Sequence, residues 1–347
     1  MKKDNQYKKI LISRTDSIGD VVLTLPLAGL LRLQYPDARI AFLGQSYTRS
    51  VIGACSFIDE FIDWQEISTL PVVEQLQRFR ELKAELIIHV FPRKEIARLA
   101  KQAGIRERIG STGRLYHWLS CNHLVRLSRR NSSLHEAQLN LMLAKDILNK
   151  ANLSLEEIPL YYGLDKHDPL PAHLNDVIDR SRFNLILHPK SKGSAREWGS
   201  KNFAALSKIL PVDKFKIFIT GTKAEGELLR SEGFFEQAGE VNDLTGSMSL
   251  GEMISFIQAA DGMVAASTGP LHLAAALGKF ALGIYPPIKP MHPGRWAPLG
   301  KKADYLVADK DCSDCRKSGP CLCMLNITPL QVKQKLEIMV YPYLQQP

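Results

Sequence analysis

The sequence contains no apolar run long enough to span a membrane, and residues 1–7 carry no apolar signal region. It also lacks the G-x-G-x-x-G fingerprint of dinucleotide-binding domains and the G-x-x-x-x-G-K-[ST] loop of P-loop enzymes. None of the standard nucleic-acid-binding motifs occurs. These absences argue against a transmembrane protein, a dinucleotide-dependent dehydrogenase, a P-loop enzyme and a nucleic-acid-binding protein. We expect a cytoplasmic protein.

Cysteine is scarce, with six residues in 347. Two of them are isolated, whereas the other four form a C-x2-C-x5-C-x-C cluster near the C-terminus: Cys312, Cys315, Cys321 and Cys323. Four thiolates can bind zinc, but a single residue between the last two ligands would strain a tetrahedral site. Disulfides are disfavoured in a reducing compartment. We expect no metal at the cluster, with a zinc site as the alternative.

The formal net charge of the chain is +9, and it is unevenly distributed. Residues 92–130 contain ten Arg or Lys and two Glu, which is ten minus two, a net charge of +8. A solvated helix face normally mixes charges of both signs. The excess favours a phosphorylated substrate or an anionic membrane surface as a partner, and charge kept for solubility is the alternative.

The chain is long enough for two globular domains, since 45% of its 347 residues are hydrophobic and 23% are charged. Apolar strand-like runs alternate with amphipathic helix-like segments in both halves. Such alternation is typical of a parallel sheet covered by helices on both faces. We predict an α/β protein with two doubly wound, Rossmann-like domains over residues 1–160 and 176–327, a linker at 161–175 and a C-terminal helix at 328–347.

The expected elements follow from these patterns and from Pro, Gly and capping residues. Strands are expected at residues 10–13, 39–43, 61–64, 86–91, 183–188, 215–220, 263–266, 280–285 and 305–308. Helices are expected at residues 21–34, 75–83, 95–103, 135–149, 201–210, 225–231, 250–260 and 328–343.

One junction joins an apolar strand directly to an Ala-rich helix through Ser267-Thr-Gly-Pro-Leu-His272. Thr268 and Gly269 lie where the first helical N–H groups have no partner within the helix. Those N–H groups and the positive end of the helix dipole favour a phosphate or another anion. An ordinary capped turn is the alternative.

A matching junction lies near the N-terminus, where a short apolar strand leads through Arg14-Thr-Asp-Ser-Ile-Gly-Asp20 into a helix. Asp20 falls in the first helical turn, where the dipole stabilises a carboxylate. Asp16 is a candidate N-cap. A catalytic role and a structural role both fit Asp20.

Together the two junctions resemble the glycosyltransferase family that contains the bacterial lipopolysaccharide heptosyltransferases. Five further strings support the resemblance in the same order: His188-Pro-Lys-Ser-Lys192, Arg196-Glu-Trp198, Asp243-Leu-Thr-Gly246, Ser249-Leu250 and Trp296-Ala-Pro-Leu-Gly300. The resemblance implies the GT-B architecture, with two facing Rossmann-like domains and a last helix that packs back on the N-terminal domain. It also implies inverting transfer of a heptose from ADP-L-glycero-D-manno-heptose to the inner core of lipopolysaccharide.

The resemblance also implies roles for individual residues. Asp20 is the expected catalytic base, and Arg196 offsets charge on the departing diphosphate. The other donor-phosphate candidates are Lys192, Ser191, Thr268, Gly269 and His272, and His272 equally fits a packing role. The ribose and nucleoside candidates are Glu225, Gly221 and Met248. For Glu225 a purely structural role is the alternative, because an acidic residue in the first turn stabilises a helix without any further function. The acceptor candidates are Arg14, Ser17, Gly19, Arg93 and Lys94.

One position departs from the family, because many members carry Asp where this chain has Ser267. The change bears on the identity of the donor and on any metal ion. We expect that no cofactor is required, with a divalent cation as the alternative. The expected partners are a nucleotide sugar and a phosphorylated glycolipid at the cytoplasmic face of the inner membrane, and no nucleic acid. The alternative functions are transfer from another nucleotide sugar and non-catalytic binding of a sugar nucleotide or glycolipid.

Overall fold

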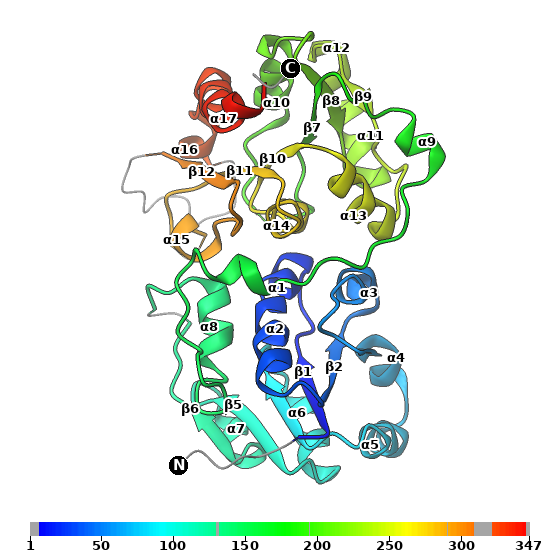
Figure 1. Ribbon diagram of the computed structural model, residues 1–347, viewed down its shortest axis with the longest axis vertical. Helices are drawn as coiled ribbons and strands as arrows, with labels where there is room; N and C mark the ends of the chain where they lie inside the picture. The colour runs from blue at the N-terminus through cyan, green and yellow to red at the C-terminus, as the bar shows by residue number, and fades with distance from the viewer. Residues whose placement is uncertain (1–6, 130–131, 194, 290, 309–320, 345–347) are drawn as a thin grey trace. The chain divides into compact units, whose positions relative to one another are not determined.

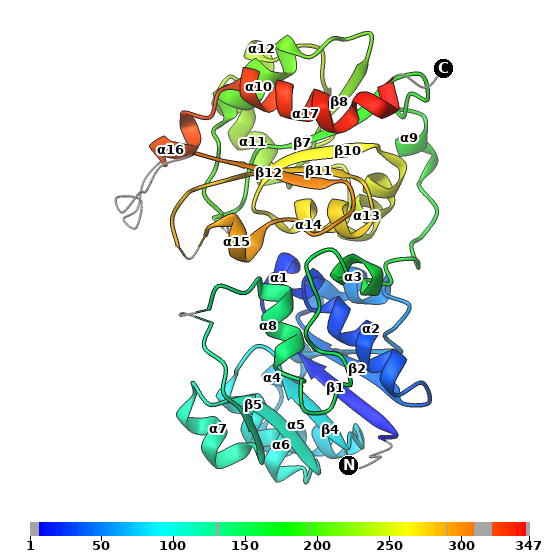
Figure 2. The same cartoon turned by 60° about the vertical axis from the view of Figure 1, so that its left-hand side comes forward.

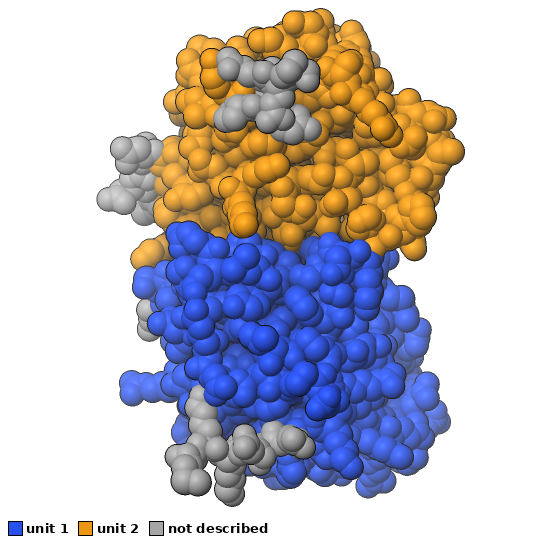
Figure 3. All heavy atoms as spheres, viewed as in Figure 1, with its two compact units in different colours: residues 1–166 blue, residues 167–347 orange. Residues whose placement is uncertain are grey.

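The computed structural model describes residues 7–129, 132–193, 195–289, 291–308 and 321–344. The chain divides into two compact units, Met1–Lys166 and His167–Pro347. Figure 1 and Figure 2 show their helices and strands, and Figure 3 colours the units separately. The boundary between the units lies within the range 161–175, where a linker is predicted.

Unit 1 is built on a six-stranded sheet with the strand order β3-β2-β1-β4-β5-β6. All of its neighbouring strands are parallel. The central strand buries Ile10, Leu11 and Ile12 completely, as a sheet covered on both faces requires. The strands are β1 (Lys9–Ser13), β2 (Arg39–Gly44), β3 (Glu60–Asp63), β4 (Leu86–His89), β5 (Glu107–Ser111) and β6 (His123–Val125).

Helices connect and cover these strands (Figure 1). They are α1 (Ile18–Val22), α2 (Leu25–Gln34), η1 (Ser46–Thr48), α3 (Arg49–Gly53), α4 (Trp64–Thr69), α5 (Val72–Glu81), α6 (Lys94–Gln102), α7 (Leu115–Ser120), α8 (Glu136–Met142) and η2 (Ile158–Tyr161).

Unit 2 repeats the architecture with a second six-stranded parallel sheet, in the order β12-β11-β10-β7-β8-β9. Its strands are β7 (Phe183–His188), β8 (Phe215–Ile219), β9 (Asn242–Asp243), β10 (Gly262–Ala266), β11 (Phe280–Tyr285) and β12 (Ala303–Val307). Its helices are α9 (Ala172–Asn175), α10 (Ser200–Ile209), α11 (Lys223–Ser231), α12 (Phe234–Gln237), α13 (Leu250–Ala259), α14 (Gly269–Ala276), α15 (Pro293–Trp296), α16 (Leu322–Leu325) and α17 (Pro329–Leu344). The predicted α/β class with two doubly wound sheets is confirmed.

Two predicted helices differ from the structure. The helix expected at 21–34 is divided into α1 and α2, because Pro26 has no N–H with which to continue the hydrogen-bond ladder. The helix expected at 135–149 ends at Met142, after which Ala144, Lys145 and Ile147 donate to carbonyls three residues earlier. Tight turns of that kind do not continue an α-helix.

The C-terminal helix α17 packs within unit 2. Val332, Leu336 and Val340 are at most 1% exposed and belong to the same hydrophobic cluster as the strands of that sheet. The helix also lies against α10. The apolar face of this helix is therefore part of the core of unit 2, and its predicted return to the N-terminal domain stays a prediction.

Each sheet has one topological switch point. It lies between two neighbouring strands whose following connections run toward opposite edges of the sheet. In unit 1 it lies between β1 and β4, and in unit 2 between β7 and β10. Ligands of open α/β sheets bind beyond the carboxyl ends of the strands at such points. Among the described residues, no helix is long and apolar enough to cross a membrane.

Candidate active site

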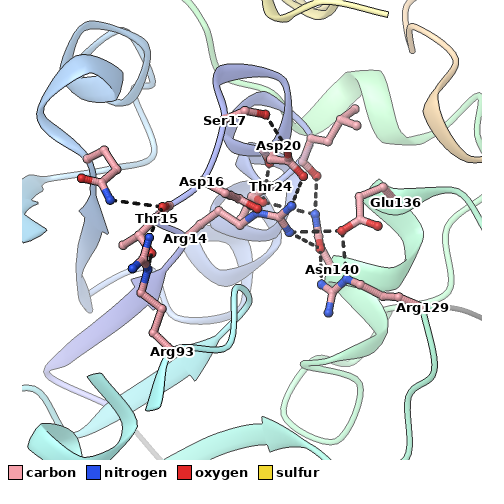
Figure 4. Close-up of polar contacts among 12 residues, drawn as sticks. Arg14, Thr15, Asp16, Ser17, Asp20, Thr24, Arg93, Arg129, Glu136 and Asn140 are labelled. Carbon is pink, nitrogen blue, oxygen red and sulfur yellow. Dashed lines mark hydrogen bonds and ion pairs between the residues drawn. The ribbon is translucent and has the colours of Figure 1, made fainter. Parts of the chain in front are cut away.

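The turn after β1 holds a buried arginine that contacts three carboxylates. Arg14 donates from Nε to Oδ1 of Asp16 at 2.7 Å and from Nη1 to Oε1 of Glu136 at 3.1 Å, and it pairs with Asp20 through Nη2 (Figure 4). Its side chain is 3% exposed. A buried charge of this kind is stable only when it is paired and hydrogen-bonded. The carboxylates keep the pKa of Arg14 above its ordinary value, although burial opposes them.

Asp20 lies in the first turn of α1, and its carboxylate is held from two sides. Arg14 donates to one carboxylate oxygen and the Ser17 hydroxyl to the other. The hydroxyl of Thr24 donates to the backbone carbonyl of Asp20 at 2.8 Å. The Asp20 side chain remains 17% exposed, so it is oriented by the protein and still open to solvent. That combination is what a general base needs.

Helix α8 completes the network with two buried polar side chains. Glu136 and Asn140 accept hydrogen bonds from Arg14 and, at 2.9 Å each, from Arg129. Asn140 also donates to the carbonyl of Leu23 at 3.0 Å. The sequence analysis missed Glu136 and Asn140. Their spacing of four residues places them on one face of the helix, but no local signal in the sequence links them to Arg14.

A second loop reaches the same switch point from β4. Arg93 donates from Nε to the Thr15 hydroxyl at 2.6 Å and from Nη2 to the Thr15 carbonyl at 3.2 Å. The structure therefore brings together Arg14, Ser17, Asp20 and Arg93, which the sequence analysis placed in one site. The remaining acceptor candidates are the buried Gly19 of α1 and the exposed Lys94, the first residue of α6.

Asp16 is the second carboxylate of the turn. Burial raises the pKa of its carboxyl group, and the negative charge of Asp20 adds to this effect, whereas Arg14 opposes it. Its backbone carbonyl accepts a hydrogen bond from Tyr47 Oη at 2.7 Å. The predicted N-cap role of Asp16 is wrong, because Ser17 is the N-cap of α1 and the Asp16 side chain accepts from Arg14.

In unit 2 the loop after β7 carries several of the donor-phosphate candidates. The Ser191 hydroxyl and backbone N–H both donate to Glu197 Oε1, at 3.1 and 2.9 Å. Arg196 is half-buried, and Lys192 is exposed with φ at 49°, a left-handed conformation that is uncommon outside glycine. Trp198 has a packing role, because it is fully buried and donates to the carbonyl of Ile327 at 2.7 Å.

This loop borders a pocket of about 380 Å³ with mixed charge. The lining includes Ser191, Arg196, Glu197, Glu232 and Lys190. Lys190 Nζ donates to both carboxylate oxygens of Glu232, at 2.7 and 2.9 Å, and lies 3.6 Å from Glu197. Because two carboxylates compensate the charge of Lys190, this lysine is a weak candidate to receive a diphosphate.

The junction after β10 has the form predicted for an anion site. Thr268 is the N-cap of α14, and Gly269 is the first helical residue. Thr268 is 3% exposed, and its Oγ1 does not cap the helix and has no hydrogen-bond partner among the described residues. A buried hydroxyl without a partner costs free energy, and a ligand atom would satisfy it. His272 is buried one turn later, 3% exposed.

The nucleoside candidates lie beyond neighbouring strands. Gly221 follows β8, and Glu225 forms a capping box with Thr222, whose backbone N–H donates to Glu225 Oε2 at 2.7 Å. Met248 is half-buried just before α13. In this structure Glu225 therefore has the structural role that is the alternative to ribose binding, because it caps the start of α11.

The cysteine cluster is only partly described. Cys312 and Cys315 lie outside the described residues, and Cys321 and Cys323 are buried without disulfides. Among the described residues, no group of three or more His, Cys, Asp or Glu side chains is arranged to hold a metal ion.

Known proteins resemble this chain over nearly its whole length. A Haemophilus influenzae protein that carries only a provisional glycosyltransferase name is 28% identical over 323 residues, 90% of each chain. The crystal structure of a glycosyltransferase family 9 protein from Veillonella parvula matches with a TM-score of 0.76 and 17% identity, over 97% of this chain and 98% of that one. The structure of the E. coli ADP-heptose lipopolysaccharide heptosyltransferase II matches with a TM-score of 0.73 and 20% identity, over 96% and 99%.

At such low sequence identity, the two solved structures establish the fold but do not define the substrate. The family assignment comes from the sequence. Glycosyltransferase family 9 (heptosyltransferase) matches residues 75–323, well over half of the chain. The chain belongs to glycosyltransferase family 9, and it is a glycosyltransferase of the heptosyltransferase type.

Proposed function

We propose that the protein is an inverting glycosyltransferase that moves a heptose from ADP-L-glycero-D-manno-heptose to the inner core of lipopolysaccharide. The observation that carries the donor half of the proposal is the buried Thr268 hydroxyl, unpartnered among the described residues, at the N-terminus of α14. Phosphate groups bind at such helix ends through backbone N–H groups and the helix dipole. The heptose is proposed from the family and from the E. coli relative named above.

Asp20 is the proposed base. The acceptor hydroxyl oxygen attacks the anomeric carbon from the face opposite the diphosphate, so one C–O bond forms while the bond to the diphosphate breaks. The acceptor proton passes to the Asp20 carboxylate, which Arg14 and Ser17 orient. ADP leaves with the bonding electron pair.

Positive charge in unit 2 offsets the charge that develops on the departing ADP. Arg196 has the planar fork that suits a diphosphate, and Ser191, Thr268 and Gly269 supply hydroxyl and backbone donors. Lys192 and His272 are secondary candidates for the phosphates. Glu225, Gly221 and Met248 are proposed to contact the ribose and adenine, for which Glu225 must give up part of its capping box.

Arginines and the helix terminus can offset the leaving-group charge without a metal ion, so we propose that no cofactor is required. Ser267, which replaces the common family carboxylate, carries a neutral hydroxyl and is a weaker ligand for a hard divalent cation. Transfer that persists in a chelator and does not rise with added Mg²⁺ would support this proposal. Activity that depends on a divalent cation would contradict it.

The acceptor is proposed to be a phosphorylated glycolipid at the cytoplasmic face of the inner membrane. Among the basic residues at 93–129, Arg93 binds Thr15 and Arg129 binds Glu136 and Asn140, so these two belong to the candidate site. Both lie in the unit that contains Asp20, where they can bind an acceptor phosphate.

The direct test is incubation of the full chain with ADP-heptose and lipopolysaccharide that lacks heptose. The mass of the acceptor and the release of ADP are then measured. A mass increase of one heptose supports the proposal. Parallel reactions with UDP- and GDP-sugars test the alternative of another donor. ADP binding without transfer from any donor would favour a non-catalytic binding protein. A nucleoside diphosphate at one hundred times its dissociation constant stabilises the protein by about 2.7 kcal/mol. Thermal shifts measured at one common concentration therefore rank the candidate nucleotides by affinity.

A further inference from the structure

Helix α7 presents an uncovered apolar face to solvent. Leu115, Trp118 and Leu119 are 87%, 60% and 77% exposed, and their spacing of three and four residues places them on one side of the helix. The opposite side is anchored, since His117 and Ser120 are buried. Three large apolar side chains together on a short helix are unusual on the surface of a monomeric protein and indicate a binding surface.

The helix is held rigidly in this exposed position. Trp118 Nε1 donates to the carbonyl of Thr112 at 3.1 Å, and Arg108 Nε donates to the carbonyl of Ser120 at 2.6 Å. Lys101 Nζ donates to the carbonyl of Leu119 at 2.7 Å. The apolar face is therefore a fixed part of the surface.

Basic side chains border this face. Helices α6 and α7 lie against each other (Figure 2), and Lys94, Arg98 and Lys101 occupy exposed positions four and three residues apart along α6. Arg114, which precedes α7, is also exposed. Within residues 93–129, Glu95 is the one exposed acidic residue. The face therefore combines apolar side chains with an excess of positive charge.

We propose that the α7 face docks on an anionic lipid bilayer, with Leu115, Trp118 and Leu119 inserted at the headgroup boundary. Trp is favoured at that depth because its ring is apolar and its N–H is polar. The basic side chains bind anionic headgroups, and their aliphatic stems lie along the apolar boundary. The inference rests on the proposed function only in that a glycolipid acceptor requires the enzyme at a membrane.

A second copy of this chain is a less suitable occupant. A two-fold dimer through α7 would bring the same basic residues of both copies together, and like charges oppose such an interface. An anionic bilayer satisfies both the apolar and the basic parts of the surface. Self-association is kept as an outcome of the test.

The test measures binding of the full chain to vesicles of phosphatidylcholine and phosphatidylglycerol in a two-to-one ratio, without donor or acceptor. Leu115→Ser combined with Leu119→Ser should lower the partition coefficient by at least about tenfold, because exposed leucines drive insertion. Arg98→Gln combined with Arg114→Gln should weaken binding and reduce its salt dependence. Vesicles of phosphatidylcholine alone should bind poorly.

Val72→Ser combined with Val73→Ser is the matched control, since these side chains are 58% and 80% exposed on α5 of the same unit. The control should bind vesicles like the wild type. Equal binding by the leucine variant, or no binding by the wild type, would overturn the proposal. A shift from dimer to monomer in the leucine variant would assign the face to self-association instead. Because no transfer is measured, these results are independent of the proposed reaction, and circular dichroism with urea unfolding checks that each variant is folded.

Discussion

Asp20 is the residue on which the proposed proton transfer depends. Asp20→Asn should lower turnover by at least about a hundredfold, because the amide cannot accept the acceptor proton. Binding of ADP should change little, since the proposed donor residues belong to unit 2. The measurement is steady-state transfer together with calorimetric titration of ADP. Asp37→Asn, at an exposed position of unit 1, should behave as the wild type. Near-normal turnover in Asp20→Asn would remove this carboxylate from the mechanism.

Glu136 is a positioning residue, because it reaches Asp20 only through Arg14. It is 1% exposed and accepts from both Arg14 and Arg129. Glu136→Gln leaves the buried guanidinium group of Arg14 and the half-buried one of Arg129 with one fewer negative charge, and we expect a loss of about 3 kcal/mol in the free energy of unfolding. Turnover should fall while the KM for the donor stays unchanged. Urea denaturation and kinetics test this, with the exposed Glu74→Gln as the control. Unchanged stability would mean that solvent compensates the arginines.

His89 should make the stability depend on pH. Burial, together with the charges of His117 and Arg108, lowers the pKa of this imidazole to about 3. The unfolded chain takes up a proton near pH 6.5 and the folded chain does not. The contribution of neutral His89 is therefore complete above pH 6.5 and decreases by about 1.4 kcal/mol per unit as the pH falls.

Urea unfolding between pH 5 and 7.5 measures this dependence. His89→Leu should reduce the slope below pH 6.5 by about one proton equivalent. His167→Leu, at an exposed histidine, should keep the wild-type slope. A slope unaffected by His89→Leu would show that other groups, such as the buried His117, dominate the acid instability.

At the level of elements, the N-terminus of α14 is a place where ligand binding can be tested independently of helix capping. The Thr268 hydroxyl does not cap the helix, so Thr268→Val should leave the unfolding free energy unchanged or raise it by about 1 kcal/mol. The same change should weaken ADP binding about tenfold if the hydroxyl binds phosphate. Calorimetry and urea denaturation give the two quantities.

Thr328 provides the matched control, because its hydroxyl accepts from the Gln331 backbone N–H at 3.3 Å at the start of α17. Thr328→Val should cost about 1 kcal/mol of stability and leave ADP binding unchanged. Unaltered ADP affinity in Thr268→Val would mean that this junction is an ordinary turn.

The elements also show how far the sequence determines the site. Both strand-to-helix junctions could be predicted, because apolar runs and capping residues are local signals. The partners of Arg14 could not, since Glu136 and Asn140 lie 122 and 126 positions away and meet it only in the folded unit. Helix α7 was also missed. Its exposed Leu115, Trp118 and Leu119 do not follow the apolar-in pattern on which such predictions depend.

At the level of the whole molecule, each unit has its own parallel sheet and, among the described residues, a hydrophobic cluster of its own. One cluster gathers side chains of β1, β2 and β4 with α4 to α6, and the other gathers β7, β8, β10 and β11 with α10 and α17. Each sheet places its candidate residues at the carboxyl ends of strands beside its own switch point. The acidic network and the anion-binding junction are therefore supported by different cores, and a core mutation should affect one site first.

The last helix provides a test of that separation. Leu336 is 1% exposed in the core of unit 2, so Leu336→Ala should cost about 3 kcal/mol by removing buried methyl groups and leaving a cavity. Hydrogen exchange should accelerate in β7 to β12 and stay unchanged in β1 to β6. Ile338→Ala, at a 73% exposed position of the same helix, should change neither. Loss of protection in β1 to β6 would instead show that α17 supports unit 1, as the family resemblance implies, and would contradict the core described here.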